Sequence, residues 1–366
     1  MGKIVRQSLP RILFCIDSMN GGGAEKLLLR YIKILQKQRQ IDMSLMILNG
    51  YGVLMQKIPS NVDVYIQNSM SASEKYTFNK EEFDVEIAFL ESKAALFIAN
   101  RQSQAIKVGW IHTDMLNNNW CNSCFPTGKQ EAIYSLLDYI VCINHYCTEC
   151  FITAFPSISY KTITCNNILD FDLMDSVLDR DYIMPKIPTF TFIGRLVNEK
   201  HPELAILALI ELLRRGFDAK ISFIGEGYLQ KLLMDLCSRY GLCNSVEFLG
   251  YISNPYKFMI RSTAILSLSE IEGGPLTLAE GYYLGIPSIS THSGGADSFK
   301  NLYGGVVMTE RNPKGLANIM ESLMDNNFHK SIKAQIIPNA IRRDFSESNF
   351  LDLIDAWISK AKYKQG

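Results

Sequence analysis

The sequence contains a glycine-rich segment flanked by two carboxylates that could bind an extended ligand. The segment 269–280 reads SEIEGGPLTLAE and follows the apolar run TAILSL. Gly273-Gly274 predicts a turn, and Pro275 suits the first position of a helix whose free N–H groups would lie beside Glu272. Glu280 would lie roughly 12 Å from Glu272 if the span were helical. This spacing favours gripping two ends of a ligand over glycosidase chemistry, which needs closer carboxylates. Alternatively, Glu272 caps the helix and Glu280 faces solvent.

Cationic side chains occur in a second segment, GRLVNEK, after another strand candidate. Arg195 offers a planar fork and Lys200 a point charge, so the two together could surround one phosphate group. The alternative is an ordinary solvated loop. Gly225-Glu226-Gly227 follows a further strand and predicts a turn at which backbone could approach a flat or anionic ligand.

A third glycine-rich segment, SMNGGGA at residues 18–24, separates a strand candidate from a helix candidate. Its glycines would let backbone approach an anion at the helix start, although a plain tight turn would look the same. The segment matches neither G-x-G-x-x-G nor G-x-x-x-x-G-K-[ST]. Nicotinamide binding and P-loop ATPase chemistry therefore lose their main support.

The elements that position these segments alternate between strand and helix patterns, which predicts an α/β fold with parallel sheets. Two tandem Rossmann-like domains are expected, with reactants at the carboxyl ends of the strands. The polar stretch 67–82 is interpreted as a loop. The strand candidates are Arg11–Asp17, Met43–Leu48, Phe83–Leu90, Lys107–His112, Tyr139–Ile143, Thr162–Cys165, Thr189–Ile193, Lys220–Ile224, Val246–Leu249, Thr263–Leu268, Pro287–Ser290 and Gly305–Met308.

Length and a proline-containing linker predict the domain boundaries. The 366 residues exceed one ordinary core, and LDRDYIMPKIP separates the two alternating halves. We expect a first Rossmann-like domain at 1–183, a second at 184–344 and a final helix at 345–366. Asp344 is predicted to be the N-cap of that helix, with Glu347 at the capping-box position.

Composition limits the function classes. Apolar residues make up 47 % and charged residues 20 %, values of a globular chain. Lys+Arg and Asp+Glu are both 37, so the net charge is 0, which argues against a dedicated nucleic-acid binder. No signal or membrane-spanning segment is recognised, and a cytoplasmic location is expected.

Two patterns leave a metal open as an alternative. Cys121, Cys124, Cys147 and Cys150 form two C-x2-C pairs, although their separation slightly exceeds the usual zinc spacing and reduced thiols fit equally. Asp170-Phe171-Asp172 spells a D-x-D metal motif. We expect no metal and no cofactor.

A basic stripe is predicted on the helix at 24–39. Its members lie three or four residues apart, so they share one face. The stripe is either a solvated face or a peripheral contact with an anionic membrane, such as the inner face of the plasma membrane. It consists of Lys26, Arg30, Lys33 and Lys37.

In order and spacing, the segments GRLVNEK, GEGYLQKL, FLGYISNPYKFM and EGGPLTLAEGYYLGIPSIS resemble glycosyltransferase family 4, and GGGAEKLL, WIHTD and TCNNILD agree more loosely. This group 1 family is retaining and uses nucleotide sugars. The resemblance implies a GT-B fold: two Rossmann-like domains facing a central cleft, with the C-terminal helix packing back on the first domain.

The resemblance also implies residue roles. Arg195 and Lys200 would hold the donor diphosphate, Glu272 the sugar hydroxyls and Glu280 the ribose, while His112 would lie near the sugar and acceptor. His112, Arg195, Lys200 and Glu272 are the expected catalytic residues. The remaining expected donor-binding residues are Gly22, Gly23, Gly225, Gly227, Gly274, Pro275, Leu276 and Thr277.

The resemblance further implies a metal-independent hexosyl- or N-acetylhexosaminyl-transferase. Its donor would be a UDP-sugar and its acceptor a glycan, for instance one linked to a polyprenyl diphosphate. Lipopolysaccharide, capsule or exopolysaccharide assembly is the expected setting. A nucleotide-sugar epimerase of the same fold and a non-catalytic module are the alternatives.

Overall fold

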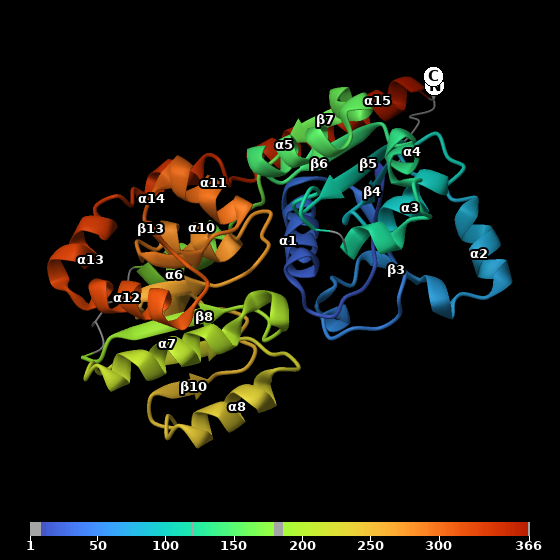
Figure 1. Ribbon diagram of the computed structural model, residues 1–366. Coiled ribbons are helices and arrows are strands. Elements are labelled where there is room, and N and C mark those ends of the chain that lie inside the picture. The colour runs from blue at the N-terminus through green and yellow to red at the C-terminus, as the bar shows by residue number, and fades with distance from the viewer. Residues whose placement is uncertain (1–8, 119, 179–185, 365–366) are drawn as a thin grey trace, which may run out of the picture. The chain divides into compact units, whose positions relative to one another are not determined.

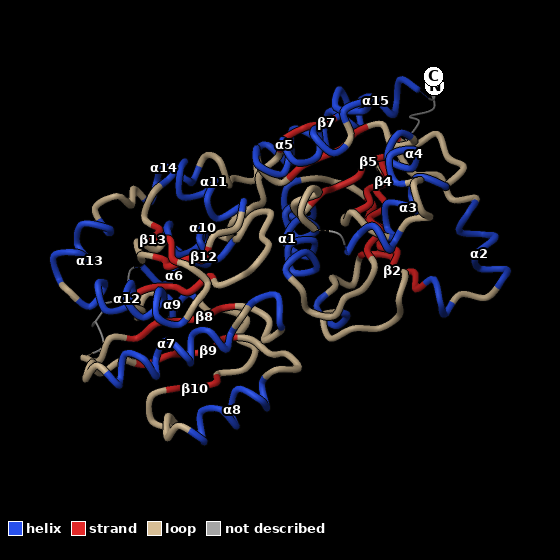
Figure 2. Tube along the Cα trace, viewed as in Figure 1, coloured by secondary structure: helices blue, strands red, loops and turns tan. Residues whose placement is uncertain are grey.

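The computed structural model describes residues 9–118, 120–178 and 186–364, which form two compact units. The first unit runs to Ile168 and resumes at Ser346, and the second comprises Leu169–Phe345. The domain boundary predicted between residues 183 and 184 lies outside the described residues. Figure 1 shows both units, and Figure 2 shows that strands and helices alternate through each of them.

The first unit contains a parallel sheet in the order β3-β2-β1-β4-β5-β6-β7. Six of these strands were predicted, and their observed bounds differ from the predicted ones at one or both ends. The exception, β3, was not predicted, because VDVYI at this sheet edge is half-exposed and contains an aspartate. The strands are β1 (Arg11–Ile16), β2 (Asp42–Ile47), β3 (Val62–Ile66), β4 (Val85–Ala88), β5 (Ile106–Ile111), β6 (Tyr139–Cys142) and β7 (Thr162–Thr164).

One helix of this unit, α2, lies where a loop was predicted. Its N-cap Ser71 forms a capping box: the Ser71 Oγ accepts from Glu74 N (3.3 Å) and the Ser71 N–H donates to Glu74 Oε2 (2.7 Å). Because α2 buries only Phe78, it shows no apolar periodicity in the sequence. The helices are α1 (Gly23–Gln38), α2 (Ala72–Asn79), α3 (Lys93–Asn100), α4 (Gln130–Ser135), α5 (His145–Ala154) and α15 (Ser348–Lys364).

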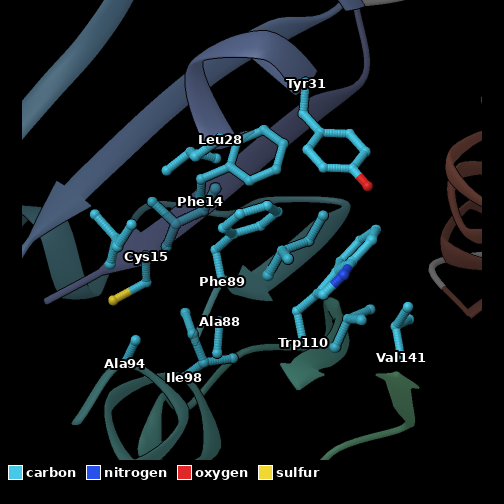
Figure 3. Close-up of a cluster of buried hydrophobic side chains, with 14 of the residues drawn as sticks. Phe14, Cys15, Leu28, Tyr31, Ala88, Phe89, Ala94, Ile98, Trp110 and Val141 are labelled. Atoms are coloured by element: carbon cyan, nitrogen blue, oxygen red, sulfur yellow. The ribbon is translucent and has the colours of Figure 1, made fainter. Parts of the chain in front are cut away.

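Aromatic side chains fill one face of this sheet. Tyr31 of α1 contacts Phe89 and Trp110, with ring centroids 5.4 Å and 5.3 Å away. In Figure 3, Leu28 and Tyr31 of α1 lie on one side of the strands, and Ala94 and Ile98 of α3 on the other. Helices therefore cover both faces, as a doubly wound fold requires.

The C-terminal helix α15 completes that aromatic cluster, and its start differs from the prediction. Phe350 is fully buried, with its ring centroid 4.2 Å from that of Tyr31. The helix begins at Ser348, so Asp344 is not its N-cap; the Asp344 carboxylate instead accepts from the Tyr303 hydroxyl (2.7 Å). Glu347 accepts from the Gln38 amide rather than forming a capping box with Asp344. The docking of this helix on the first unit is confirmed.

Replacing Phe350 by alanine should lower the free energy of unfolding of the first unit by about 3–5 kcal/mol, because it leaves a cavity against Tyr31 and Trp110. Urea unfolding measures the loss. Tyr363→Ala, on the same helix but 88 % exposed, is the control and should change it by less than about 0.5 kcal/mol. Equal effects of the two substitutions would contradict the docked helix.

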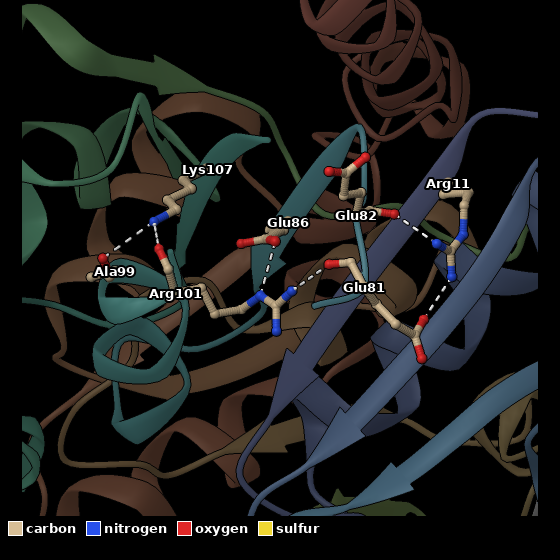
Figure 4. A network of polar contacts seen from close by, with 7 residues as sticks. All are labelled: Arg11, Glu81, Glu82, Glu86, Ala99, Arg101 and Lys107. Carbon is tan, nitrogen blue, oxygen red and sulfur yellow. Dashed lines mark hydrogen bonds and ion pairs between the residues drawn. The ribbon is translucent and has the colours of Figure 1, made fainter. Parts of the chain in front are cut away.

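Charged side chains, some buried and some partly exposed, join the amino-terminal ends of this sheet (Figure 4). Arg101 donates to Glu86 of β4 (2.9 Å) and to the Glu81 carbonyl (3.0 Å), and Arg11 at the start of β1 pairs with the Glu81 carboxylate (2.7 Å). The Lys107 ammonium donates to the Ala99 carbonyl (3.3 Å), and burial lowers its pKa. These charged groups therefore all have hydrogen-bond or ion-pair partners within the first unit.

The second unit contains a parallel sheet in the order β10-β9-β8-β11-β12-β13. All of its strands were predicted, β8 and β9 with the same bounds and the other four with shifted ends. The strands are β8 (Thr189–Ile193), β9 (Lys220–Ile224), β10 (Val246–Phe248), β11 (Ala264–Ser267), β12 (Ser288–Thr291) and β13 (Val306–Thr309). The helices are α6 (Phe171–Leu178), α7 (Pro202–Arg214), α8 (Gln230–Arg239), α9 (Tyr256–Met259), α10 (Leu276–Tyr283), α11 (Gly294–Tyr303), α12 (Pro313–Met324), α13 (Asn326–Lys333) and α14 (Pro338–Arg342).

The strand order reverses once in each sheet. The chain proceeds to one side from β1 and then returns to place β4 on its other side, and β8 and β11 repeat this arrangement. At such a point the loops after the two strands diverge and leave room for a ligand at the carboxyl ends. The predicted site segments follow these strands, and the prediction of two parallel α/β sheets is confirmed.

Candidate functional site

Lys200 and Glu272 form an ion pair at the reversal point of the second sheet. Lys200 ends the short 3-10 helix η5 (Asn198–Lys200) after β8, and Glu272 lies in the loop after β11. The Lys200 ammonium donates to Glu272 Oε1, which also accepts from the Ser269 hydroxyl (2.6 Å). Both charged side chains are partly exposed, so a ligand can reach them. The structure thus brings two predicted catalytic residues together and adds Ser269, which was not predicted.

Arg195 is exposed in the loop after β8. No hydrogen bond or ion pair joins its guanidinium to another described residue. Its position after the strand carrying the Lys200 loop makes it available to an anion, because its charge is not used within the protein.

The helix that starts at the reversal point, α10, has an uncapped N-terminus. Pro275 is its N-cap in extended conformation rather than its first helical residue, so the helix begins at Leu276. Within the described residues no side chain caps its first N–H groups. The backbone at Gly274, Leu276 and Thr277 therefore offers donors and the positive end of the helix dipole to an anion.

Glu280 lies on α10 and is oriented by a tyrosine. Its Oε1 accepts from the Tyr256 hydroxyl of α9 (2.9 Å), and the Tyr256 side chain is buried. Tyr256 belongs to GYISNPYKFM, one of the segments that carry the family resemblance. Its hydrogen bond to Glu280 was not predicted.

Gly225 and Gly227 allow two loops of the site to pack together. A Cβ on Gly225 would lie 1.9 Å from the Gly194 carbonyl oxygen, and one on Gly227 2.2 Å from the Leu196 carbonyl oxygen. Their small size is thus required for contact between the β9 loop and the β8 loop. Direct donor binding by these glycines stays a prediction.

In the first unit, Gly22 is the N-cap of α1 and Gly23 its first residue. The Glu25 carboxylate lies over this turn: a Cβ on Gly22 would be 2.2 Å from its Oε2, and its Oε1 lies 3.3 Å from the Ser18 hydroxyl. An incoming anion would meet this carboxylate, so the turn is a less favourable anion site than the start of α10.

His112 lies directly after β5 and is neutral at physiological pH. Its ring packs on Phe89, with centroids 4.8 Å apart, and burial lowers its pKa to about 3. Its Nε2 is inaccessible and has no hydrogen-bond partner among the described residues.

Glu91 is a buried carboxyl beside His112 that the sequence analysis missed. It follows β4, is 1 % exposed and accepts from the His112 backbone N–H (2.7 Å). Burial raises its pKa to about 7, although the His112 N–H favours the charged form, and the nearby Asp17 raises the pKa further. The signal available was an acidic residue directly after a predicted strand.

Glu91→Gln should change the pH dependence of stability. Folding raises the Glu91 pKa from 4.5 to about 7. The contribution of Glu91 to the free energy of unfolding is therefore complete below pH 4.5 and is lost as the pH rises to about 7. His112, with its lowered pKa, acts in the opposite direction over the range 3 to 6.5. The free energy of unfolding of the variant, relative to that of wild type, should therefore rise by about 3 kcal/mol between pH 4.5 and 7. Urea unfolding at a series of pH values measures it.

The exposed Glu149→Gln is the control for that series and should show a difference from wild type that changes little with pH. A difference between Glu91→Gln and wild type that stays constant from pH 4.5 to 7 would contradict the placement of a protonated Glu91.

The two metal patterns have structural roles where they are described. Cys147 and Cys150 are buried on α5, where burial raises the pKa of both thiols, that of Cys150 to about 11. The Cys121 side chain lies outside the described part. Asp170 accepts from the Leu173 N–H (3.1 Å) at the start of α6. Among the described side chains, no three His, Cys, Asp or Glu residues are grouped to hold a metal ion.

The chain is similar to known glycosyltransferases. Residues 183–343 match the family model "Glycosyl transferases group 1". An uncharacterized glycosyltransferase of Methanocaldococcus jannaschii is 29 % identical over 44 % of this chain, and the match spans only 41 % of that relative. A Campylobacter jejuni enzyme is 24 % identical over 93 % of this chain and 95 % of its own. That enzyme is described as an α-1,4-N-acetyl-D-galactosaminyltransferase acting on an undecaprenol-diphosphate-linked glycan.

A solved structure shares the fold. Anabaena HepE in complex with UDP-glucose superposes with a TM-score of 0.75 at 18 % identity, covering 96 % of this chain and 99 % of that one. The likeness extends over both units.

Proposed function

Residues 183–343 place this chain among the group 1 glycosyltransferases, with the GT-B fold, and on that premise we propose that it transfers a sugar from a UDP-sugar to a lipid-linked glycan. The observation that carries the proposal is the Lys200–Glu272 pair beside the uncapped N-terminus of α10. A cation, a carboxylate and free N–H groups at one sheet edge suit a ligand with a diphosphate and a sugar.

The donor and acceptor classes draw support from the similar proteins. The Anabaena structure holds UDP-glucose, and the Campylobacter relative is named for an undecaprenol-diphosphate-linked acceptor. We therefore propose a UDP-hexose or UDP-N-acetylhexosamine donor and a polyprenyl-diphosphate-linked acceptor. The setting we propose is bacterial surface polysaccharide assembly.

The chemistry follows from where charge develops. When the bond between the sugar and the diphosphate breaks, negative charge accumulates on the phosphate oxygens. Lys200, the unpaired Arg195 and the N–H groups at the start of α10 stabilise that charge without a metal ion. As Lys200 turns to the diphosphate, Glu272 is released to accept hydrogen bonds from the sugar hydroxyls, while the Ser269 hydroxyl continues to orient it.

Glu280 would bind the ribose diol in the same complex. The Tyr256 hydroxyl donates to one of its oxygens and so orients the carboxylate, whose oxygens are suitable acceptors for a hydroxyl pair. His112 is proposed to contact the sugar or the acceptor as a neutral ring.

Lys200→Ala and Glu272→Gln should each lower kcat for acceptor-dependent UDP release by roughly 10²–10³-fold, because each removes a group that acts at the reacting centre. Turnover is measured with purified protein, a panel of UDP-sugars and an undecaprenyl-diphosphate-linked oligosaccharide. Proton NMR of the product reports whether the anomeric configuration is retained.

Glu199→Gln, an exposed neighbour of Lys200, is the matched control and should keep wild-type turnover. Wild-type activity of Glu272→Gln would refute the assignment. UDP-sugar conversion that proceeds equally without acceptor would favour the epimerase alternative instead.

We also propose that α1 contacts an anionic membrane surface. The stripe predicted from the sequence is exposed at Lys26, Lys33 and Lys37, whereas Arg30 donates to the Ile168 carbonyl (2.5 Å). Arg39, next to the stripe, pairs with Asp355 of α15 (2.7 Å). None of the described helices combines the length and apolar composition needed to cross a bilayer.

Replacing Lys26, Lys33 and Lys37 together by glutamine should weaken binding to vesicles containing anionic lipid by roughly 100-fold, since each cation contributes about 1 kcal/mol at such a surface. Co-sedimentation measures the binding. Lys314, Lys330 and Lys333 are exposed on the second unit, and their joint replacement by glutamine makes the same charge change. Equal binding of the two triple variants would contradict a membrane-facing α1.

A further inference from the structure

His201 follows Lys200 directly and has a conformation that a side chain normally disfavours. With φ 48° and ψ 48° it lies in the left-handed region, and it is the one non-glycine residue with positive φ among those described. Glycine adopts this conformation without steric cost. A histidine at this position is therefore strained unless its ring compensates.

The His201 ring lies between two carboxylates from different elements. Its Nδ1 is 2.9 Å from Glu203 Oε1, at the start of α7, and its Nε2 is 3.8 Å from Glu270 Oε2, in the loop after β11. The Nε2 is inaccessible and makes no hydrogen bond with a described residue. Arg311 also forms an ion pair with Glu270, with its Nη1 3.9 Å from the carboxylate. The ring thus hydrogen-bonds to Glu203 on one side and lies against Glu270, on the loop that carries Glu272, on the other.

Backbone contacts connect the same two loops. The Glu270 N–H donates to the Glu199 carbonyl (3.1 Å), immediately before Lys200. The His201 N–H donates to the Asn198 carbonyl (3.1 Å) and so closes the η5 turn. The Lys200–Glu272 ion pair is therefore built on two segments that are joined both by main chain and by the His201 ring.

We propose that His201 is a positioning residue: its ring fastens the Lys200 turn to the Glu270–Glu272 loop and sets Lys200 against Glu272 before the donor binds. The role in turnover rests on the proposed function. It explains why this left-handed position holds an imidazole, since glycine would relieve the strain but could not bridge the loops. Groups that must meet a diphosphate and a sugar at once gain from being fixed beforehand.

His201→Gly separates this role from a purely structural one. Glycine accepts the left-handed backbone, so the variant should keep or raise the unfolding temperature, whereas kcat should fall about tenfold with the donor KM changing less than about twofold. His201→Asn, which tolerates this backbone but is too short to bridge, should show the same fall in kcat. Wild-type kcat in His201→Gly would overturn the proposal.

A double-mutant cycle tests the bridge without any assay of activity. The effects of His201→Gly and Glu270→Ala on the unfolding temperature should be non-additive, because each removes one end of the same contact. His201→Gly with Glu199→Ala is the matched control and should be additive. Additivity in the first cycle would overturn the bridge. If Lys200→Ala and Glu272→Gln keep wild-type turnover, the proposed function has failed, and the cycle still decides on the bridge.

Discussion

The site depends on one topological constraint, the reversal of strand order in each parallel sheet. All strand carboxyl ends in a sheet point to one edge, and only at the reversal do two adjacent loops diverge. In the second unit this places the loops of Lys200 and Glu272 side by side although they are far apart in sequence. In the first unit it places the α1 glycine turn, which follows β1, near Glu91, which follows β4. The charged pairs at the amino ends, such as Arg101–Glu86, lie at the opposite ends of the strands.

At the reversal point of the second sheet, two opposite charges form an ion pair that a ligand could replace. Lys200 and Glu272 neutralise each other, yet both remain partly exposed. In the proposed reaction a diphosphate binds the lysine while sugar hydroxyls bind the carboxylate, so neither charge is left unpaired during the exchange. In that proposal, Arg195 and the start of α10 add positive potential for the diphosphate. The hydrogen bond from Ser269 limits how far the Glu272 carboxylate can turn, and the one from Tyr256 does the same for Glu280.

The sequence predicted most strands, because buried parallel strands are short apolar runs followed by turns. It also identified Lys200 and Glu272 individually, but their contact depends on the register of β8 and β11, which one sequence does not reveal. The helix α2 was missed because it buries a single side chain, although its Ser71–Glu74 capping box was readable. Asp344 was misassigned because the helix begins later, at Ser348. The burial of Glu91 beside His112 and the contact of His201 with Glu270 are tertiary features that no local pattern encodes.

The placement of α15 has a consequence for biosynthesis. The chain leaves the first unit at Ile168 and returns at Ser346, so the whole second unit is translated before Phe350 and Trp357 reach the core. At ordinary elongation rates this interval lasts roughly 10–35 seconds. During that time the nascent first sheet exposes the aromatic surface around Tyr31 and Trp110, whereas the second unit can already complete its own core. The unit made first is therefore the one whose core is completed last.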